Sequence, residues 1–367
     1  MSRPRLFYIL DSLEENEVGD HVVTLLGRLP RSRFEPRVVS LGPKGTLGDR
    51  LRESKVPVHE LELSGAMGAL MAVPRLRKLL GRLNAQILQT FQPWSGTVAQ
   101  LAAPRDAQVF RWVEGFPPAP ASMEERLQAW LERRASMRRK RHFITSDARA
   151  VERVGQEYRV DNVEVVPQCL DLGQLRSRVE GTGLREARLR LGLEEGQRTL
   201  AAVSDFRDRA RMSQLLEGFA TARREEPGLR LFLAGQGPEE GAVRGLAEDL
   251  RLEDSVIFVG TNQDRPTMLR VADVVVDAGS WPGWARCAVE AMAMEVPVLR
   301  WVDDEDDPEA RQYSAHTTGP ADRFARDVLD VLEDAPLRAR MVQRAAEEAR
   351  AFDVALVADR WTEIYGQ

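Results

Sequence analysis

The chain has 367 residues, of which 43% are hydrophobic and 30% are charged, and its net charge is -5. This length predicts two domains, and the acidic balance argues against a dedicated nucleic-acid-binding protein, because phosphate contacts require a basic surplus. The two cysteines, Cys169 and Cys287, are too few for a disulfide framework or a cysteine-built metal site. There is no run of 18 apolar residues and no cleavage-like site near the first residues, so we expect a cytoplasmic protein without a spanning helix or a secretory signal.

Short β-branched or aliphatic runs alternate with longer amphipathic stretches through the first half of the chain. The runs predicted as strands are residues 5–10, 37–41, 58–63, 87–90, 108–113, 142–146 and 163–167. The stretches predicted as helices include residues 18–29, 70–83 and 123–139. Strands separated by helices imply βαβ units and a parallel sheet.

A polar, poorly periodic break at residues 171–183 separates this array from a second one. The second array has predicted strands at 199–204, 231–234, 256–260, 274–277 and 296–301, and predicted helices at 212–224, 239–250, 285–294 and 322–333. Residues 336–365 are almost wholly helical in pattern, with an interruption near Phe352 and Asp353. Two such arrays predict two Rossmann-like domains, and a cleft at the carboxyl ends of their strands is the expected ligand site.

Five short motifs follow one another in the second half of the chain. They are Gly235-Gln236-Gly237-Pro238, Val256-Ile257-Phe258-Val259-Gly260, Ala272-Asp273-Val274, Glu290-Ala291-Met292-Ala293 and Val296-Pro297-Val298. In this order they resemble the retaining glycosyltransferases of family 4, which have the α/β GT-B fold of two facing Rossmann-like domains with parallel sheets and an inter-domain cleft. The resemblance extends over essentially residues 5–365. It implies an acceptor-side domain at 1–175, a nucleotide-sugar-binding domain at 176–350, and a final helix at 351–367 that crosses back to the first domain.

The resemblance also implies where a nucleoside-diphosphate sugar would bind. The helix that follows the Gly283 loop would face the diphosphate, because free backbone N–H groups and the helix dipole favour anions. Gly235 and Gly237 would shape the neighbouring turn, Trp284 could stack on the base or the sugar, and Glu290 would accept hydrogen bonds from the ribose. The alternative for Glu290 is a position in an amphipathic helix without a ligand. Enzymes of this fold need no metal for chemistry, so no metal or other cofactor is expected.

Several residues depart from the family pattern at the donor side. Pro282 stands where the family has the first of two glutamates, and Asp205 and Ala210 stand where it has an arginine and a lysine that neutralise the leaving diphosphate. A carboxylate beside a diphosphate is repulsive. Arg207, Arg209 and Arg211 lie close by in sequence and are candidates to substitute for the lost charges; the alternative is a solvated turn.

The acceptor side departs from the family as well. Residues 11–19 are acidic with a single glycine, where the family has a glycine-rich loop that approaches the donor phosphate. Gln89, Phe91 and Glu114 occupy positions where histidines are frequent. Glu114 is a candidate for hydrogen bonding to a sugar, and a surface glutamate is the alternative.

Two charged segments allow more than one interpretation. The basic residues of 133–141 could contact an anionic membrane surface at the inner side of the membrane, where lipid-linked acceptors reside, or could form a solvated helix face. The acidic run 303–307 lacks the spacing of a calcium loop, which favours a solvated loop.

The resemblance implies an enzyme of polysaccharide biosynthesis. It would move a sugar from a nucleoside-diphosphate donor to a saccharide or lipid-linked acceptor with retention of configuration. The substituted charges support an alternative, a catalytically impaired GT-B protein that binds a nucleotide sugar, a glycan or a partner enzyme.

Overall fold

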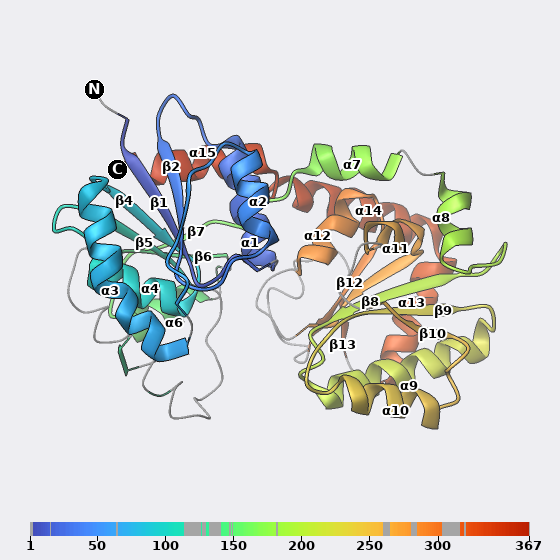
Figure 1. Ribbon diagram of the computed structural model, residues 1–367. Coiled ribbons are helices and arrows are strands. Elements are labelled where there is room, and N and C mark those ends of the chain that lie inside the picture. Colours follow the sequence, from blue (N-terminus) through green and yellow to red (C-terminus); the bar gives the residue numbers. More distant parts are fainter. Residues whose placement is uncertain are drawn as a thin grey trace. The chain divides into compact units, whose positions relative to one another are not determined.

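The computed structural model describes residues 3–14, 16–63, 65–113, 126, 130–131, 141–146, 148, 150–180, 183–259, 265–279, 285–302, 316–318 and 321–366. The chain divides into two units (Figure 1). Unit 1 consists of Met1–Leu170 together with Val354–Gln367, and unit 2 consists of Asp171–Asp353. These junctions lie a few residues from the domain bounds expected from the sequence.

Unit 1 is built on a parallel sheet whose strand order, among the described residues, is β3-β2-β1-β4-β5-β6-β7. The strands are β1 (Arg5–Leu10), β2 (Glu35–Ser40), β3 (Val58–Glu60), β4 (Ile87–Thr90), β5 (Gln108–Trp112), β6 (Arg141–Thr145) and β7 (Val163–Val165). The helices are α1 (Glu17–Arg28), α2 (Thr46–Glu53), α3 (Gly65–Arg82), α4 (Pro93–Ala102), α6 (Ala150–Tyr158) and α15 (Val354–Ile364). The strand order reverses between β1 and β4, which makes that position the topological switch point of the unit.

Unit 2 contains a second parallel sheet, with the order β10-β9-β8-β11-β12-β13 in the part of the chain that is described. Its strands are β8 (Thr199–Ser204), β9 (Arg230–Gly235), β10 (Val256–Phe258), β11 (Val274–Asp277), β12 (Val298–Val302) and β13 (His316–Thr318). Its helices are α7 (Leu172–Glu180), α8 (Leu184–Arg190), α9 (Arg209–Glu225), α10 (Glu240–Asp249), α11 (Arg265–Val271), α12 (Arg286–Ala293), α13 (Ala321–Glu333) and α14 (Ala335–Arg350). Helices α9, α10 and α13 pack together on one side of this sheet, and α8, α11 and α12 pack on the other (Figure 1). The prediction of two Rossmann-like parallel-sheet domains is confirmed.

The structure corrects the prediction of an irregular break at 171–183, because residues Leu172–Glu180 form helix α7. Asp171 explains where this helix starts: its Oδ1 accepts a hydrogen bond from the backbone N–H of Gln174 at 2.8 Å, which satisfies a donor of the first turn. Strand β13 and helices α2, α4, α6, α8 and α11 were not predicted. The helix predicted at 123–139 lies almost entirely outside the described residues. The described helices are each too short or too polar to cross a lipid bilayer.

The last helix, α15, belongs to unit 1 and packs against α1. Its buried face includes Val357, Trp361 and Tyr365, which recur at the helical spacing of four residues. Trp361 is fully buried and stacks on Trp112 with 5.7 Å between ring centroids. Leu356, on the same helix, is 57% exposed, because its position is rotated away from this face.

A network of hydrogen-bonded polar side chains lies inside the core of unit 1, next to the end of α15. The hydroxyl groups of Tyr8 and Tyr365 lie 3.0 Å apart, and the Tyr365 hydroxyl donates to Gln89 Oε1 at 3.2 Å. Gln89 Nε2 in turn donates to the backbone oxygen of Thr90 at 3.0 Å. Burial raises the pKa of both Tyr8 and Tyr365 above the ordinary tyrosine value, so both phenols stay neutral.

Tyr365→Phe is expected to lower the free energy of unfolding by about 1–3 kcal/mol, because it leaves buried polar groups of Tyr8 and Gln89 without a partner. Adding Tyr8→Phe should cost less than the two single losses together, since the two hydroxyls bond each other. Urea unfolding of the three variants measures this. Strictly additive losses would contradict the hydrogen-bonded pair.

Candidate functional site

The carboxyl ends of three neighbouring strands meet at the switch point of unit 2, between β8 and β11. These ends are Ser204 on β8, Gly235 on β9 and Asp277 on β11. In open parallel sheets ligands bind at such a position, since the following loops diverge to opposite faces and leave space between them. The site is therefore formed by the β8–α9, β9–α10 and β11–α12 connections.

Gly235 and Gly237 let two of these connections approach each other closely. Gly235 has φ +136°, and a Cβ placed on it would lie 1.8 Å from the backbone oxygen of Ser204. A Cβ on Gly237 would lie 1.9 Å from the backbone oxygen of Asp205. Both glycines thus allow the turn to pack against the β8–α9 backbone.

Gly235→Ala is expected to destabilise unit 2 by about 1–3 kcal/mol through backbone strain, with the clash at Ser204 in addition. Gly241→Ala is the matched control, because α10 offers open space there and alanine favours a helix by about 0.5–1 kcal/mol over glycine. Thermal unfolding compares the two. Equal stability of Gly235→Ala and the wild type would contradict the close approach.

Asp277 closes the loop between β11 and α12. Its carboxylate is buried, and Oδ2 accepts from the backbone N–H of Ala285 at 3.0 Å while Oδ1 accepts from that of Gly279 at 3.5 Å. Both ends of the loop are thereby held at the end of β11, and α12 begins at the switch point. No role was predicted for Asp277 from the sequence; the signal for it was a carboxylate directly after the buried run Val274–Val276.

The three candidate arginines after β8 lie in different surroundings. Arg207 is 67% exposed, and its Nε lies 3.6 Å from Asp205 Oδ2. The carboxylate of Asp205 therefore partly neutralises the positive charge of Arg207. Arg209 is exposed at the start of α9. Arg211 is buried, and its Nη1 donates to the backbone oxygen of Gly279 at 2.6 Å. Among the described residues of the β11–α12 loop, Gly279 is contacted by Arg211 through this structural hydrogen bond.

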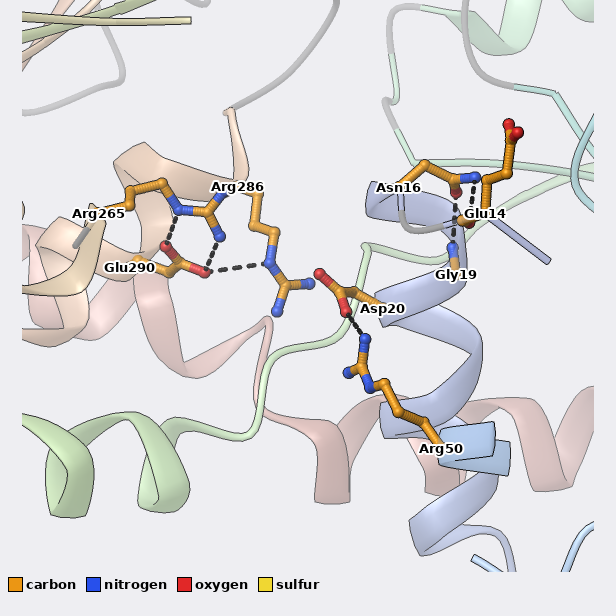
Figure 2. Close-up of polar contacts among 8 residues, drawn as sticks. All are labelled: Glu14, Asn16, Gly19, Asp20, Arg50, Arg265, Arg286 and Glu290. Atoms are coloured by element: carbon orange, nitrogen blue, oxygen red, sulfur yellow. Dashed lines mark hydrogen bonds and ion pairs between the residues drawn. The ribbon is translucent and has the colours of Figure 1, made fainter. Parts of the chain in front are cut away.

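Glu290, the expected ribose ligand, lies on α12 with its side chain 5% exposed and its carboxylate between two arginines (Figure 2). Arg265, the first residue of α11, donates from Nε to Oε2 and from Nη2 to Oε1, both at 3.2 Å. Arg286, the first residue of α12, donates from Nε to Oε1 at 3.0 Å. The sequence analysis missed both arginines; Arg286 stands four residues before Glu290 and faces it across one helical turn.

Unit 1 satisfies its own polar groups near its switch point. Partly buried Asp11, directly after β1, accepts from the backbone N–H of Ser95 at 2.5 Å and so holds the first turn of α4. Burial raises the pKa of Asp11 above the ordinary value. Gln89 is bound to Tyr365, and Phe91 is buried in the aromatic core, so neither replaces a histidine as a polar group for a substrate.

The acidic loop after β1 caps helix α1. Asn16 Oδ1 accepts from the backbone N–H of Gly19 at 2.8 Å, and Asn16 Nδ2 donates to the backbone oxygen of Glu14 at 3.0 Å (Figure 2). In the first turn, Asp20 pairs with Arg50 of α2 at 2.7 Å. A capping side chain therefore satisfies a backbone N–H group of the first turn of α1, in the segment where the family has its glycine-rich loop.

Some expected site residues are outside the described residues: Glu114, Pro282, Gly283 and Trp284, together with the basic segment 133–140 and the acidic run 303–307. Within the part that is described, no group of three His, Cys, Asp or Glu side chains is arranged to hold a metal ion.

Two family models match successive parts of the chain. A model for Glycosyltransferase Family 4 matches residues 18–174, and a model for Glycosyl transferases group 1 matches residues 185–348. Between them they account for most of the chain and follow its division into two units.

Individual relatives share parts of the sequence. The chain is 29% identical over 138 residues to the alpha-monoglucosyldiacylglycerol synthase of Streptococcus pneumoniae, covering 37% of this chain and 31% of that protein. It is 28% identical over 164 residues to the N-acetyl-alpha-D-glucosaminyl L-malate synthase of Bacillus anthracis, covering 42% of each. The chain thus spans less than half the length of either relative.

The fold is shared over nearly the whole chain with Anabaena HepE, whose structure is solved in complex with UDP, with UDP and glucose, and with UDP-glucose. The UDP complex has a TM-score of 0.78 and 16% sequence identity, and the match covers 99% of both chains. This chain therefore has the GT-B fold, and its successive parts match the models of Glycosyltransferase Family 4 and of Glycosyl transferases group 1.

Proposed function

We propose that the protein is a glycosyltransferase that uses a UDP-sugar as donor and transfers a hexose to a hydroxyl group of a saccharide or lipid-linked acceptor. The observation that carries the proposal is the loop between β11 and α12, whose ends Asp277 holds so that α12 begins at the switch point of unit 2. The first backbone N–H groups of a helix have no partner within the helix and attract an anion. A diphosphate is the anion that a group 1 domain would bind there.

The proposed donor follows from the nucleotide found in a protein of the same fold. HepE binds UDP and UDP-glucose, so uracil is the base and glucose the first sugar to test. In this chain Gly235 and Gly237 would shape the wall of the donor site, and Glu290 would lie beside the ribose. Gly283 and Trp284 remain proposed donor contacts on the basis of the family motif.

The proposed acceptor class rests on the names of relatives, one of them an alpha-monoglucosyldiacylglycerol synthase and another a lipopolysaccharide core biosynthesis glycosyltransferase of Rhizobium meliloti. A saccharide or lipid-linked acceptor is consistent with a role in polysaccharide biosynthesis. A lipid-linked acceptor would bring the protein into peripheral contact with a membrane. Glu114 stays a candidate to hydrogen-bond that acceptor.

The proposed reaction breaks the bond between the anomeric carbon and the diphosphate oxygen, while the acceptor oxygen bonds to the same face of the anomeric carbon. The configuration is then retained, the acceptor proton is released, and the nucleoside diphosphate leaves with the bonding electron pair. Donors aimed at the leaving oxygens stabilise the charge that develops there, and one such donor contributes about 3–4 kcal/mol to a typical barrier. The N–H groups of α12 and nearby arginines would have this role.

The test is a donor hydrolysis and transfer assay with UDP-glucose, UDP-N-acetylglucosamine and UDP-galactose, with the anomeric configuration of the product read by NMR. Release of UDP with an α-configured product would support the proposal. Nucleotide binding without turnover for any donor would replace it with the alternative of a binding protein, which the matched families do not favour. An inverted product would contradict the retaining mechanism.

A further inference from the structure

The positive charges that should neutralise the donor diphosphate are missing from the β8–α9 turn. Asp205 and Ala210 occupy the two positions. Arg207 is committed to Asp205 at 3.6 Å, and Arg211 is committed to the backbone oxygen of Gly279 at 2.6 Å. Arg209, the third candidate, is exposed at the start of α9, so the described part of this turn offers no buried arginine whose guanidinium is left for a diphosphate at the switch point.

Helix α12 offers that partner in Arg286. Its side chain is 12% exposed, its Nε donates to Glu290, and its buried Nη1 has no hydrogen-bond partner among the described residues. A buried guanidinium N–H without an acceptor is costly, and such a group in a native protein calls for a functional reason. The preceding residue, Ala285, donates its backbone N–H to Asp277 Oδ2. Arg286 therefore lies close to the edge of the sheet at which β11 ends.

The partners of Glu290 explain how Arg286 is oriented. The carboxylate accepts three N–H donors, two from Arg265 and one from Arg286, out of about four acceptor sites. A single carboxylate can neutralise one of the two guanidinium charges it contacts. Arg286 is thus fixed through Nε, with the opposite side of its guanidinium left to bind an anion, in a largely dehydrated place where charge attraction is strong.

We propose that Arg286 binds the donor diphosphate in place of the positive charges missing at positions 205 and 210, and that Glu290 is a positioning residue for Arg286. This inference rests on the proposed function and deepens it. It differs from the role expected from the family motif, in which Glu290 binds the ribose. The two roles predict different losses of affinity in Glu290 variants when the binding of UDP and the binding of uridine are measured separately.

The experiment titrates the intact chain with UDP and with uridine, the latter by competition, for the wild type, Arg286→Leu, Arg286→Gln and Glu290→Gln. If Arg286 binds the diphosphate, Arg286→Leu should weaken UDP binding by about 10- to 100-fold, the range for one charge-assisted hydrogen bond, and leave uridine binding unchanged. Arg286→Gln keeps N–H donors without the charge and separates loss of charge from loss of packing. Glu290→Gln should show the same selective loss of UDP affinity.

Arg190→Leu is the matched control, because Arg190 also pairs with a glutamate four residues away in unit 2, Glu186, but on the exposed surface of α8. It should bind UDP as the wild type does. UDP affinity unchanged in Arg286→Leu and Arg286→Gln, or equal losses of UDP and uridine in these variants, would overturn the inference. A wild-type chain that binds no nucleoside diphosphate would overturn the proposed function itself, and the inference with it.

Discussion

Glu290→Ala is expected to lower the free energy of unfolding of unit 2 by about 3–5 kcal/mol, the cost of removing one partner from a buried ion pair. The carboxylate is 5% exposed and binds both Arg265 and Arg286. Its removal leaves two guanidinium groups close together without their shared counter-charge. The loss should appear as a lower urea midpoint of unit 2 at unchanged slope.

Glu186→Ala is the control for this prediction. Glu186 pairs with Arg190 at 2.6 Å on the same kind of helical spacing, but both side chains are exposed, so the loss should stay within about 1 kcal/mol. If Glu290→Ala costs no more than Glu186→Ala, Glu290 is not the centre of a buried charge cluster, and its assignment as a positioning residue is wrong.

Trp361→Ala is expected to cost unit 1 about 3–5 kcal/mol, the range for truncating a fully buried aromatic side chain. Trp361 contacts Trp112, Phe91 and Tyr365 at ring-centroid distances of 5.7, 6.4 and 5.1 Å. The cavity left by alanine would separate α15 from α1. Chemical denaturation followed by tryptophan fluorescence and by circular dichroism measures the loss.

Two variants separate the role of the ring from that of the helix. Trp361→Phe should cost far less, because it keeps most of the apolar contact and removes a buried Nε1–H that has no partner among the described residues. Leu356→Ala, at an exposed position of the same helix, should change stability by less than about 0.5 kcal/mol. Equal losses for Trp361→Ala and Leu356→Ala would contradict the packing of α15 in unit 1.

The sequence was sufficient for the parallel sheets because their central strands are continuous apolar runs. Strands β8 and β11 are buried along their whole length, and such runs are typical of sheets covered on both faces. Helix α4 was missed because Ser95, Gly96 and Thr97 are weak helix formers, and the helix depends on packing against α3. Strand β13 is only three residues long and owes its position to pairing with β12.

Site residues could be predicted from the sequence where they belong to a local sequence motif. The positions of Gly235 and Gly237 follow from a strand that ends in a glycine turn, and Glu290 follows from a motif on one helix. Arg265 could not be found in this way, because it lies 25 residues before Glu290 and reaches it through the packing of α11 on α12. The local sequence between Asp205 and Arg211 suggested that nearby arginines replace the missing charges at the diphosphate. In the tertiary structure, however, Arg207 pairs with Asp205 and Arg211 binds the backbone oxygen of Gly279.

The most direct test of the account is a calorimetric titration of the intact, folded wild-type chain with UDP and with UMP. If the diphosphate binds at the start of α12, UDP should bind saturably with one site per chain and more tightly than UMP. Failure of UDP, GDP and ADP to bind, or equal affinity for UDP and UMP, would contradict a donor site at the switch point of unit 2.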